Sequence, residues 1–245
     1  MLAATLSEVR GWSLRQNVPG GRIMTFHAID TPVDGDTNNI YNMTHQTFLR
    51  HIQALREIID FVPALHVAPI NDRTNSSISI TFDDGYATML TIAAPLLAES
   101  LLPFHVYVSP ALIESGDRRY LSRAQLIDLA QIPGVTIGAH SYQHLPLSSF
   151  APEHRVRELS RARVWLEDVL QTPVTTMSYP FGDTPENITE AVRNAGYTSA
   201  ACSVWGFNDS STNPLLLRRL DFWQGDSKHT VKAKLLGHWN WIPFN

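Results

Sequence analysis

Two adjacent carboxylates and a pair of histidines are the residues of this sequence whose types and spacing could do chemistry. Asp83 and Asp84 follow an apolar run and precede Gly85, which allows a sharp turn of the backbone. Adjacent carboxylates repel each other, so they favour a bound cation or a hydrogen-bonded carboxylate that serves as a base. A plain Asp-Asp-Gly surface turn is the alternative that this segment alone leaves open.

His140 and His144 stand four residues apart. On one helical turn this spacing puts both imidazoles on the same face, where they can share a metal ion, as in histidine-based zinc sites. One aspartate would complete a set of two histidines and one carboxylate that leaves positions open for water and substrate. Because Cys202 is the only cysteine, an internal disulfide and a thiolate metal site are excluded, so His, Asp or Glu must hold any metal.

Short β-branched or aromatic runs alternate with longer amphipathic segments along the chain. Seven segments are predicted to be strands: 22–27, 77–82, 104–108, 135–139, 174–179, 197–202 and 216–221. A helix is predicted over 44–61 with Thr44 as N-cap, another from Ser122 with Gln125 in a capping box, and a third over about 152–170. A fourth is expected after Thr184, with Pro185 in its first turn and Gly196 after its end.

This alternation indicates parallel strands joined by right-handed crossovers in one domain spanning 1–245, with a core of about 22–222. Seven strands fit a barrel or a doubly wound sheet. Polar residues stand at or just after the carboxyl ends of the strands, where α/β barrels build their active sites. They are His27, Asp83, Asp84, His140, His144, Tyr179 and Arg219.

The composition is that of an ordinary globular protein, with 44% hydrophobic and 17% charged residues. The formal charge of −4 gives no basic field for nucleic acid, and no local basic cluster replaces it. Residues 1–10 lack a basic lead, and Ser7 and Glu8 interrupt their apolar run, so no signal peptide is expected. With no stretch apolar enough to cross a bilayer, we expect a cytoplasmic protein that could associate with membranes only through its substrate.

Three motifs occur in order on successive predicted strands: Thr-Phe-Asp-Asp-Gly at 81–85, His-Ser-Tyr-Gln-His at 140–144 and Tyr-Pro-Phe-Gly at 179–182. They resemble the first three motifs of the polysaccharide deacetylase family, also called the NodB-homology domain or carbohydrate esterase family 4. The resemblance covers roughly 22–222. It implies an α/β fold, a single distorted (β/α)7 barrel with the active site at the C-terminal ends of the strands, which agrees with the seven predicted strands.

The resemblance implies a role for each matching residue. Asp83 matches the catalytic base, Asp84 the carboxylate ligand of a metal, and His140 and His144 its two histidine ligands. Phe181 matches the residue whose backbone N–H stabilises the oxyanion. A divalent metal there would polarise the acetamide carbonyl and lower the pKa of a water, whose proton Asp83 would take. Zinc is the default for this ligand set, which also suits cobalt, nickel or iron.

The third motif departs from the family pattern. Ser178 stands where the family usually has an arginine that holds the catalytic aspartate, so another cation should orient Asp83. Arg219 belongs to the segment 217–221 at the end of the last predicted strand, which resembles an arginine-bearing strand found in one branch of the family. It is our candidate, and a solvated arginine beside a strand is the alternative.

The proton donor to the leaving amine is a choice between two histidines. The family often takes it from a C-terminal Leu-x-His, which 236–238 matches, but His238 follows a predicted helix without the apolar strand that should precede it. His27 resembles the early histidine motif of the branch that includes poly-N-acetylglucosamine-type exopolysaccharide deacetylases, and we prefer it. Tyr179 and Trp205 could stack on a sugar, although packing explains them equally well. The remaining histidines are interpreted as structural or solvent-exposed: His45, His51, His66, His105, His154 and His229.

The predicted function is therefore a metal-dependent hydrolase of carbon–nitrogen bonds other than peptide bonds, which removes the N-acetyl group of an acetamido sugar. Without a visible secretion signal, the expected substrate is an intracellular nucleotide-linked or lipid-linked precursor in surface polysaccharide or lipopolysaccharide (O-antigen) assembly. Hydrolysis of another amide, by a deformylase or a cyclic-ureide hydrolase on this scaffold, is one alternative. A non-catalytic sugar-binding relative is the other; the adjacent carboxylates argue against it, and the missing motif-three arginine argues weakly for it.

Overall fold

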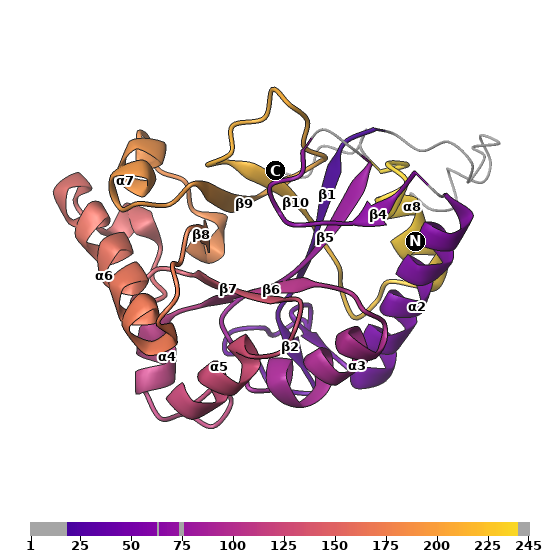
Figure 1. Cartoon of the computed structure of the whole chain (residues 1–245), viewed down its shortest axis with the longest axis horizontal. Coiled ribbons are helices and arrows are strands. Elements are labelled where there is room, and N and C mark those ends of the chain that lie inside the picture. Colours follow the sequence, from indigo (N-terminus) through magenta and orange to yellow (C-terminus); the bar gives the residue numbers. More distant parts are fainter. Residues whose placement is uncertain (1–18, 63, 74–75, 240–245) are drawn as a thin grey trace.

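Seven parallel strands close into a barrel in the part of the chain that the computed structural model describes, residues 19–62, 64–73 and 76–239 (Figure 1). Their order is β1 (Gly21–Phe26), β10 (Leu217–Asp221), β9 (Ser199–Trp205), β8 (Thr176–Ser178), β7 (Val135–Ala139), β6 (Phe104–Val108) and β5 (Ser77–Phe82). β5 pairs with β1 along its whole length and closes the ring. The predicted (β/α)7 barrel is confirmed, and the doubly wound alternative is wrong. Residues 1–10, on which the signal-peptide prediction rests, lie outside the described residues.

Three short strands accompany the barrel, and the sequence pattern does not predict them. β4 (His66–Val67) pairs with the beginning of β5. β2 (Ala28–Ile29) and β3 (Asn42–Met43) pair in parallel as a separate two-stranded sheet. Since β2 follows β1 after one residue, this small sheet holds the 30–41 loop near the carboxyl end of β1.

The seven helices of the described segments surround the strands. They are α2 (His45–Phe61), α3 (Ala94–Glu99), α4 (Pro110–Glu114), α5 (Arg123–Ala130), α6 (Pro152–Leu170), α7 (Ile188–Asn194) and α8 (Lys228–Leu235). A π-helical turn, Met89–Ala93, leads into α3. In Figure 1, α2 and α8 lie side by side at the right edge and α6 and α7 at the left edge. Among the described residues, no helix is long and apolar enough to cross a membrane.

Side-chain caps explain where two of the predicted helices begin. The Thr44 hydroxyl accepts the Thr47 N–H at 3.2 Å, so α2 begins at the next residue. At α5, the Gln125 N–H donates to Ser122 Oγ (3.2 Å) and the Ser122 N–H donates back to Gln125 Oε1 (2.8 Å). This reciprocal pair is the predicted capping box, and it satisfies two of the backbone donors that a helix start leaves open.

The predicted start of α7 is wrong. The helix begins at Ile188 rather than near Pro185, because Asn187 adopts a left-handed conformation (φ 61°) that no right-handed helix can pass through. Pro185 lies in the preceding turn, where its carbonyl accepts the Ile188 N–H. Gly196 follows the helix as predicted, with a φ of +93°.

β9 also differs from its predicted range. It begins two residues later than 197 and continues to Trp205. Ala201 pairs with Leu217 and Trp205 with Arg219, so four residues of β9 advance beside two residues of β10. This bulge keeps the last residues of β9 paired with β10 and places Trp205 opposite Arg219.

Side chains of the barrel strands alternate between the helical layer and the barrel interior. Met24 and Phe26 of β1 belong to the main core under the helices, whereas Ile23 belongs to a small separate cluster with Tyr107. The interior is tightly filled, since a Cβ on Gly138 would lie 2.6 Å from the Tyr107 ring. Residues in phase with Ile23 therefore point inward up to the carboxyl end, which we call the mouth of the barrel.

Candidate active site

Polar side chains from five strands meet at the mouth, because alternation turns every second residue inward. Each lies within two residues of the carboxyl end of its strand. They are His27 after β1, Asp83 after β5, His140 after β7, Ser178 on β8, and Arg219 and Asp221 on β10. Asp84, next to Asp83, adopts a φ of +70°, and Gly85 follows with +77°, so the chain turns sharply there.

Asp84, His140 and His144 lie close enough to hold one metal ion. One ligand atom from each of the three side chains lies within 4.8 Å of the others. Asp84 Oδ1 is 3.3 Å from His140 Nε2 and 2.9 Å from His144 Nε2. Burial alone would raise the pKa of Asp84, but hydrogen bonds from the two imidazoles outweigh it and hold that pKa well below its ordinary value.

The surroundings of His140 fit a metal ligand. His140 Nδ1 lies 3.0 Å from the Ser178 carbonyl oxygen, to which only a protonated ring nitrogen can donate. With Nδ1 as the donor to this carbonyl, Nε2 is the nitrogen that faces Asp84 and could bind a metal ion. Ser109 Oγ donates to the His140 carbonyl at 2.5 Å and fixes the backbone. Two imidazoles and one carboxylate that face one point are a donor set for zinc and related divalent cations.

Residues 140–144 do not form the helical turn on which a spacing of four residues would put both imidazoles on one face. The segment is a loop in which Ser141 and His144 both have positive φ angles, 56° and 55°. In a helix the His144 N–H would donate to the His140 carbonyl, but here it donates to Ser141 Oγ at 3.2 Å. The two rings still meet, with centroids 5.1 Å apart, through loop geometry rather than helical spacing.

Asp83 and Arg219 form a buried pair. Arg219 Nη1 donates to Asp83 Oδ1 at 2.8 Å and Nη2 to Oδ2 at 2.7 Å, and the two residues are only 2% and 3% exposed. Arg219 Nε donates to the Cys202 carbonyl, and Ser178 Oγ lies 3.2 Å from Asp83 Oδ1. The solvated-arginine alternative is therefore wrong.

The charge of Arg219 keeps Asp83 ionised. Burial alone would raise the pKa of Asp83, but the positive charges of Arg219 and then His140 outweigh burial and lower that pKa below its ordinary value. Burial alone would lower the pKa of Arg219. The negative charge and hydrogen bonds of Asp83 outweigh burial, so the pKa of Arg219 is raised. The pair thus presents a carboxylate with a lowered pKa next to Asp84, the carboxylate of the possible metal-binding group.

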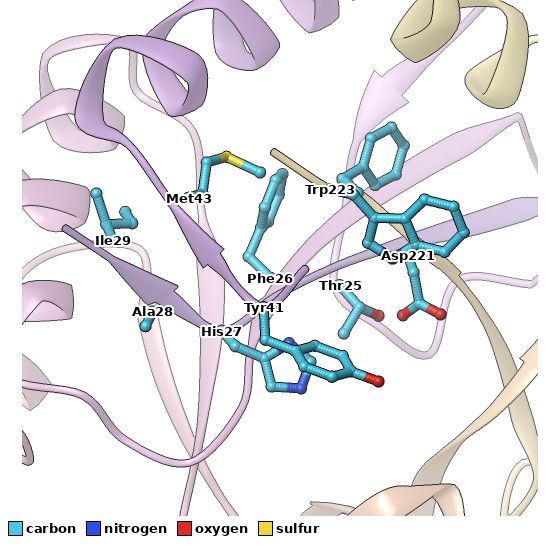
Figure 2. A pocket seen from close by; sticks show the side chains of 10 residues that line it. Thr25, Phe26, His27, Ala28, Ile29, Tyr41, Met43, Asp221 and Trp223 are labelled. Carbon is cyan, nitrogen blue, oxygen red and sulfur yellow. The ribbon is translucent and has the colours of Figure 1, made fainter. Parts of the chain in front are cut away.

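A small pocket beside this pair contains His27, Tyr41 and Asp221 (Figure 2). The His27 and Tyr41 rings lie 4.7 Å apart, and Figure 2 shows the Asp221 carboxylate on the same side of the pocket as the Tyr41 hydroxyl. Asp36 holds the Tyr41 segment by accepting the Ile40 and Tyr41 N–H groups at 2.8 and 2.7 Å. Burial raises the pKa of Asp221, which the charges of Arg219 and His27 lower only in part.

Asp221 and Tyr41 are site residues that the sequence reasoning misses. A signal for Asp221 exists, since it stands two residues after Arg219 on the same strand and so shares its inward phase. Tyr41 directly precedes β3, which pairs with β2 next to β1. No periodicity in the sequence predicts that this pairing places Tyr41 beside His27.

Of the remaining predicted residues, Phe181 lies at the mouth, whereas Tyr179 and Trp205 are engaged in packing. Phe181 lies at the mouth, 67% exposed, with its ring 5.0 Å from that of His144, and no described residue accepts a hydrogen bond from its backbone N–H. Tyr179 is fully buried and donates to the Leu215 carbonyl at 2.7 Å, so its ring is not available to a sugar. Trp205 packs against the C-terminal segment, 6.3 Å from the Trp239 ring.

His238 lies apart from the mouth. It follows α8, whose last residue, Leu235, accepts a hydrogen bond from Arg22 at the amino end of β1. This contact places the end of α8 near the opposite end of the barrel from His27. His238 is buried, and burial lowers its pKa.

Residues 70–200 match the polysaccharide deacetylase family. The putative polysaccharide deacetylase YxkH of Bacillus subtilis (strain 168) is 28% identical over 118 residues, which are 48% of this chain and 41% of that protein. The match thus spans less than half of the relative's length.

Two solved structures resemble the whole barrel. The Streptococcus pyogenes deacetylase PplD in complex with acetate has a TM-score of 0.75 and 18% identity, over 89% of this chain and 99% of that one. IcaB from Ammonifex degensii has a TM-score of 0.74 and 17% identity, over 90% and 98%. At these identities the likeness establishes a shared fold.

Proposed function

Because this chain belongs to the polysaccharide deacetylase family, we propose that it is a metal-dependent hydrolase that removes the N-acetyl group of an acetamido sugar. One observation carries the proposal: the triad of Asp84, His140 and His144 adjoins the buried carboxylate of Asp83, which is held ionised by Arg219. Burying two adjacent carboxylates costs stability, and a protein that only binds a neutral sugar needs neither of them.

In the proposed reaction, Asp83 is the base and Phe181 supplies a hydrogen-bond donor. A divalent metal bound by Asp84, His140 and His144, with zinc as the first choice and cobalt, nickel or iron as others, would polarise the amide carbonyl and acidify a water. Asp83 takes the proton of the attacking water, since Arg219 keeps its carboxylate ionised and oriented. The backbone N–H of Phe181, a residue that is 67% exposed, donates to the carbonyl oxygen as negative charge develops on it.

His27 is the proposed acid that protonates the departing amine. The position of His27 at the mouth and of His238 beyond α8 supports this choice. Asp221 lines the same pocket as His27. The half-exposed Tyr41 ring beside His27 is a suitable contact for the sugar. For the sugar itself we propose a unit of a surface polysaccharide or lipopolysaccharide precursor, carried by a nucleotide, a lipid or a polymer.

Removing the metal tests the proposal directly. Chelation is expected to abolish acetate release from a panel of free, nucleotide-linked and oligomeric N-acetyl sugars, and added zinc should restore it. Asp84→Asn is expected to lose both zinc and acetate release, because the triad loses its only anionic ligand. Asp128→Asn, a change at an exposed residue on α5, is the matched control. Formate release from N-formyl sugars without any acetate release would instead identify the deformylase alternative.

The role of His27 makes a separate prediction that depends on the leaving group. His27→Gln is expected to slow acetate release from an N-acetyl sugar by about 100-fold, because the amine departs poorly without a proton. Hydrolysis of an aryl acetate should change little, since a phenolate leaves without one. The measurement is kcat/KM for both substrates, with the half-exposed His66→Gln on β4 as the control. Equal losses on the two substrates would contradict an acid role.

A further inference from the structure

The loop between the two histidines of the triad is held in an unusual conformation. Ser141 and His144 both have positive φ angles, 56° and 55°. For residues other than glycine, such angles are strained and persist only where the surroundings enforce them. A local helical turn, on which a spacing of four residues would also bring the two imidazoles to one face, would avoid this strain.

Glu158 of α6 binds the two residues at the centre of this loop. Its Oε1 accepts the backbone N–H groups of Tyr142 at 2.9 Å and Gln143 at 2.6 Å. Its Oε2 accepts the Gln143 side-chain Nε2–H at 3.1 Å. Glu158 is only 5% exposed, so both carboxylate oxygens are used in the interior. Hydrogen bonds from N–H groups to a buried carboxylate are among the stronger ones in a protein.

Neighbouring contacts reinforce the same conformation. Arg161, three residues further along α6, stacks its guanidinium 3.5 Å from the centre of the Tyr142 ring, and the Tyr142 hydroxyl donates to Glu114 Oε2 at 2.5 Å. Ser109 Oγ occupies the His140 carbonyl, which a helical turn would need as an acceptor for His144. The loop is therefore fixed from α6 on one side and from the end of β6 on the other.

We propose that Glu158 is a positioning residue for the metal site, one that sets the 140–144 loop so that His144 faces Asp84. This inference rests on the proposed metal-dependent function. Glu158 touches neither of the two histidine side chains; it acts through the backbone of Tyr142 and Gln143. Without its carboxylate, these two N–H groups lose their acceptor and the loop is free to turn, which moves His144 Nε2 away from its 2.9 Å contact with Asp84.

Zinc affinity of the metal-free protein is the decisive measurement, since it needs no substrate. Glu158→Gln is expected to weaken zinc binding by about 10- to 100-fold in competition with a chelating dye, the range typical of residues that orient metal ligands. Glu153→Gln, at an exposed position in the first turn of α6, is the matched control and should bind zinc like the wild type. Thermal melting of both metal-free variants reports on folding independently.

A double-mutant cycle with His144→Ala distinguishes positioning from general stability. If Glu158 acts by placing His144, Glu158→Gln should weaken zinc binding far less once His144 is absent. An equal loss in both backgrounds, or zinc affinity within twofold of wild type, would overturn the inference. If the amide variant does not fold, Glu158→Asp serves the same cycle with a shortened carboxylate. Wild-type protein that binds no zinc would instead refute the proposed function.

Discussion

Arg219→Met is expected to lower the free energy of unfolding by about 3–5 kcal/mol, the range for breaking a buried ion pair from one side. Arg219 is the cation bonded to both oxygens of Asp83. Methionine fills much of the same volume but leaves the carboxylate buried without a counter-charge. It also removes the donor to the Cys202 carbonyl. A buried donor or acceptor that loses its partner keeps the cost of desolvation without the compensating bond.

Equilibrium denaturation of the metal-free protein measures this effect. Arg218→Met is the matched control, because Arg218 is the preceding residue on β10 and its side chain is exposed. The double variant Asp83→Asn, Arg219→Met should recover part of the loss, since no unpaired charge then remains buried. Arg219→Lys should be intermediate, because an ammonium keeps the charge but cannot donate two parallel bonds. A loss no larger than that of Arg218→Met would show that the pair does not stabilise the mouth.

The sequence predicts the barrel because its rules are local. β5, β6 and β7 coincide with three predicted strands, and α2 and α5 begin after the predicted caps, since alternation and capping depend on neighbouring residues alone. The wrong bounds of α7 and β9 come from single irregular backbone conformations. Asn187 adopts a left-handed conformation that delays α7, and a bulge lengthens β9; neither leaves a periodic signal.

The site is predicted to the extent that it depends on strand ends. Asp83, His140 and Arg219 each continue the set of alternate strand residues that point into the barrel. Their convergence therefore follows from the barrel once its strands are known. Contacts across long loops have no such rule. Tyr41 reaches His27 through the β2–β3 sheet, and Glu158 reaches the 140–144 loop from a helix surface. Only tertiary packing brings these side chains to the mouth.

Loop conformation also decides how the histidines are presented. Spacing of four residues is compatible with a helix, yet the actual loop places the two rings side by side. The backbone of the two histidines bonds to serine hydroxyls, and the backbone of Tyr142 and Gln143 between them bonds to Glu158. A pattern of residue types thus predicted that two histidines meet, through a geometry that the chain does not adopt. The chemistry of the donors, not their helical periodicity, was the informative part of the motif.

Asp83→Asn is expected to reduce acetate release by roughly 10²–10⁴-fold, the usual contribution of a general base, while the protein keeps its zinc. The amide accepts no proton from water, but Asp84, His140 and His144 remain unchanged. Asp84→Asn should instead lose zinc, and acetate release should be lost because the zinc is absent. The two adjacent variants therefore separate a base from a ligand by measuring kcat/KM and bound zinc in the same samples.

Folding must be monitored in this comparison, because Asp83→Asn leaves Arg219 with a neutral partner in the barrel interior. Zinc binding at wild-type stoichiometry shows that the mouth is assembled, so a loss of turnover in such a sample belongs to the reaction rather than to unfolding. Full turnover in zinc-loaded Asp83→Asn would exclude Asp83 as the base. The proton acceptor would then have to be another group at the mouth, and Asp221, which lines the same pocket as His27, would be the first carboxylate to test.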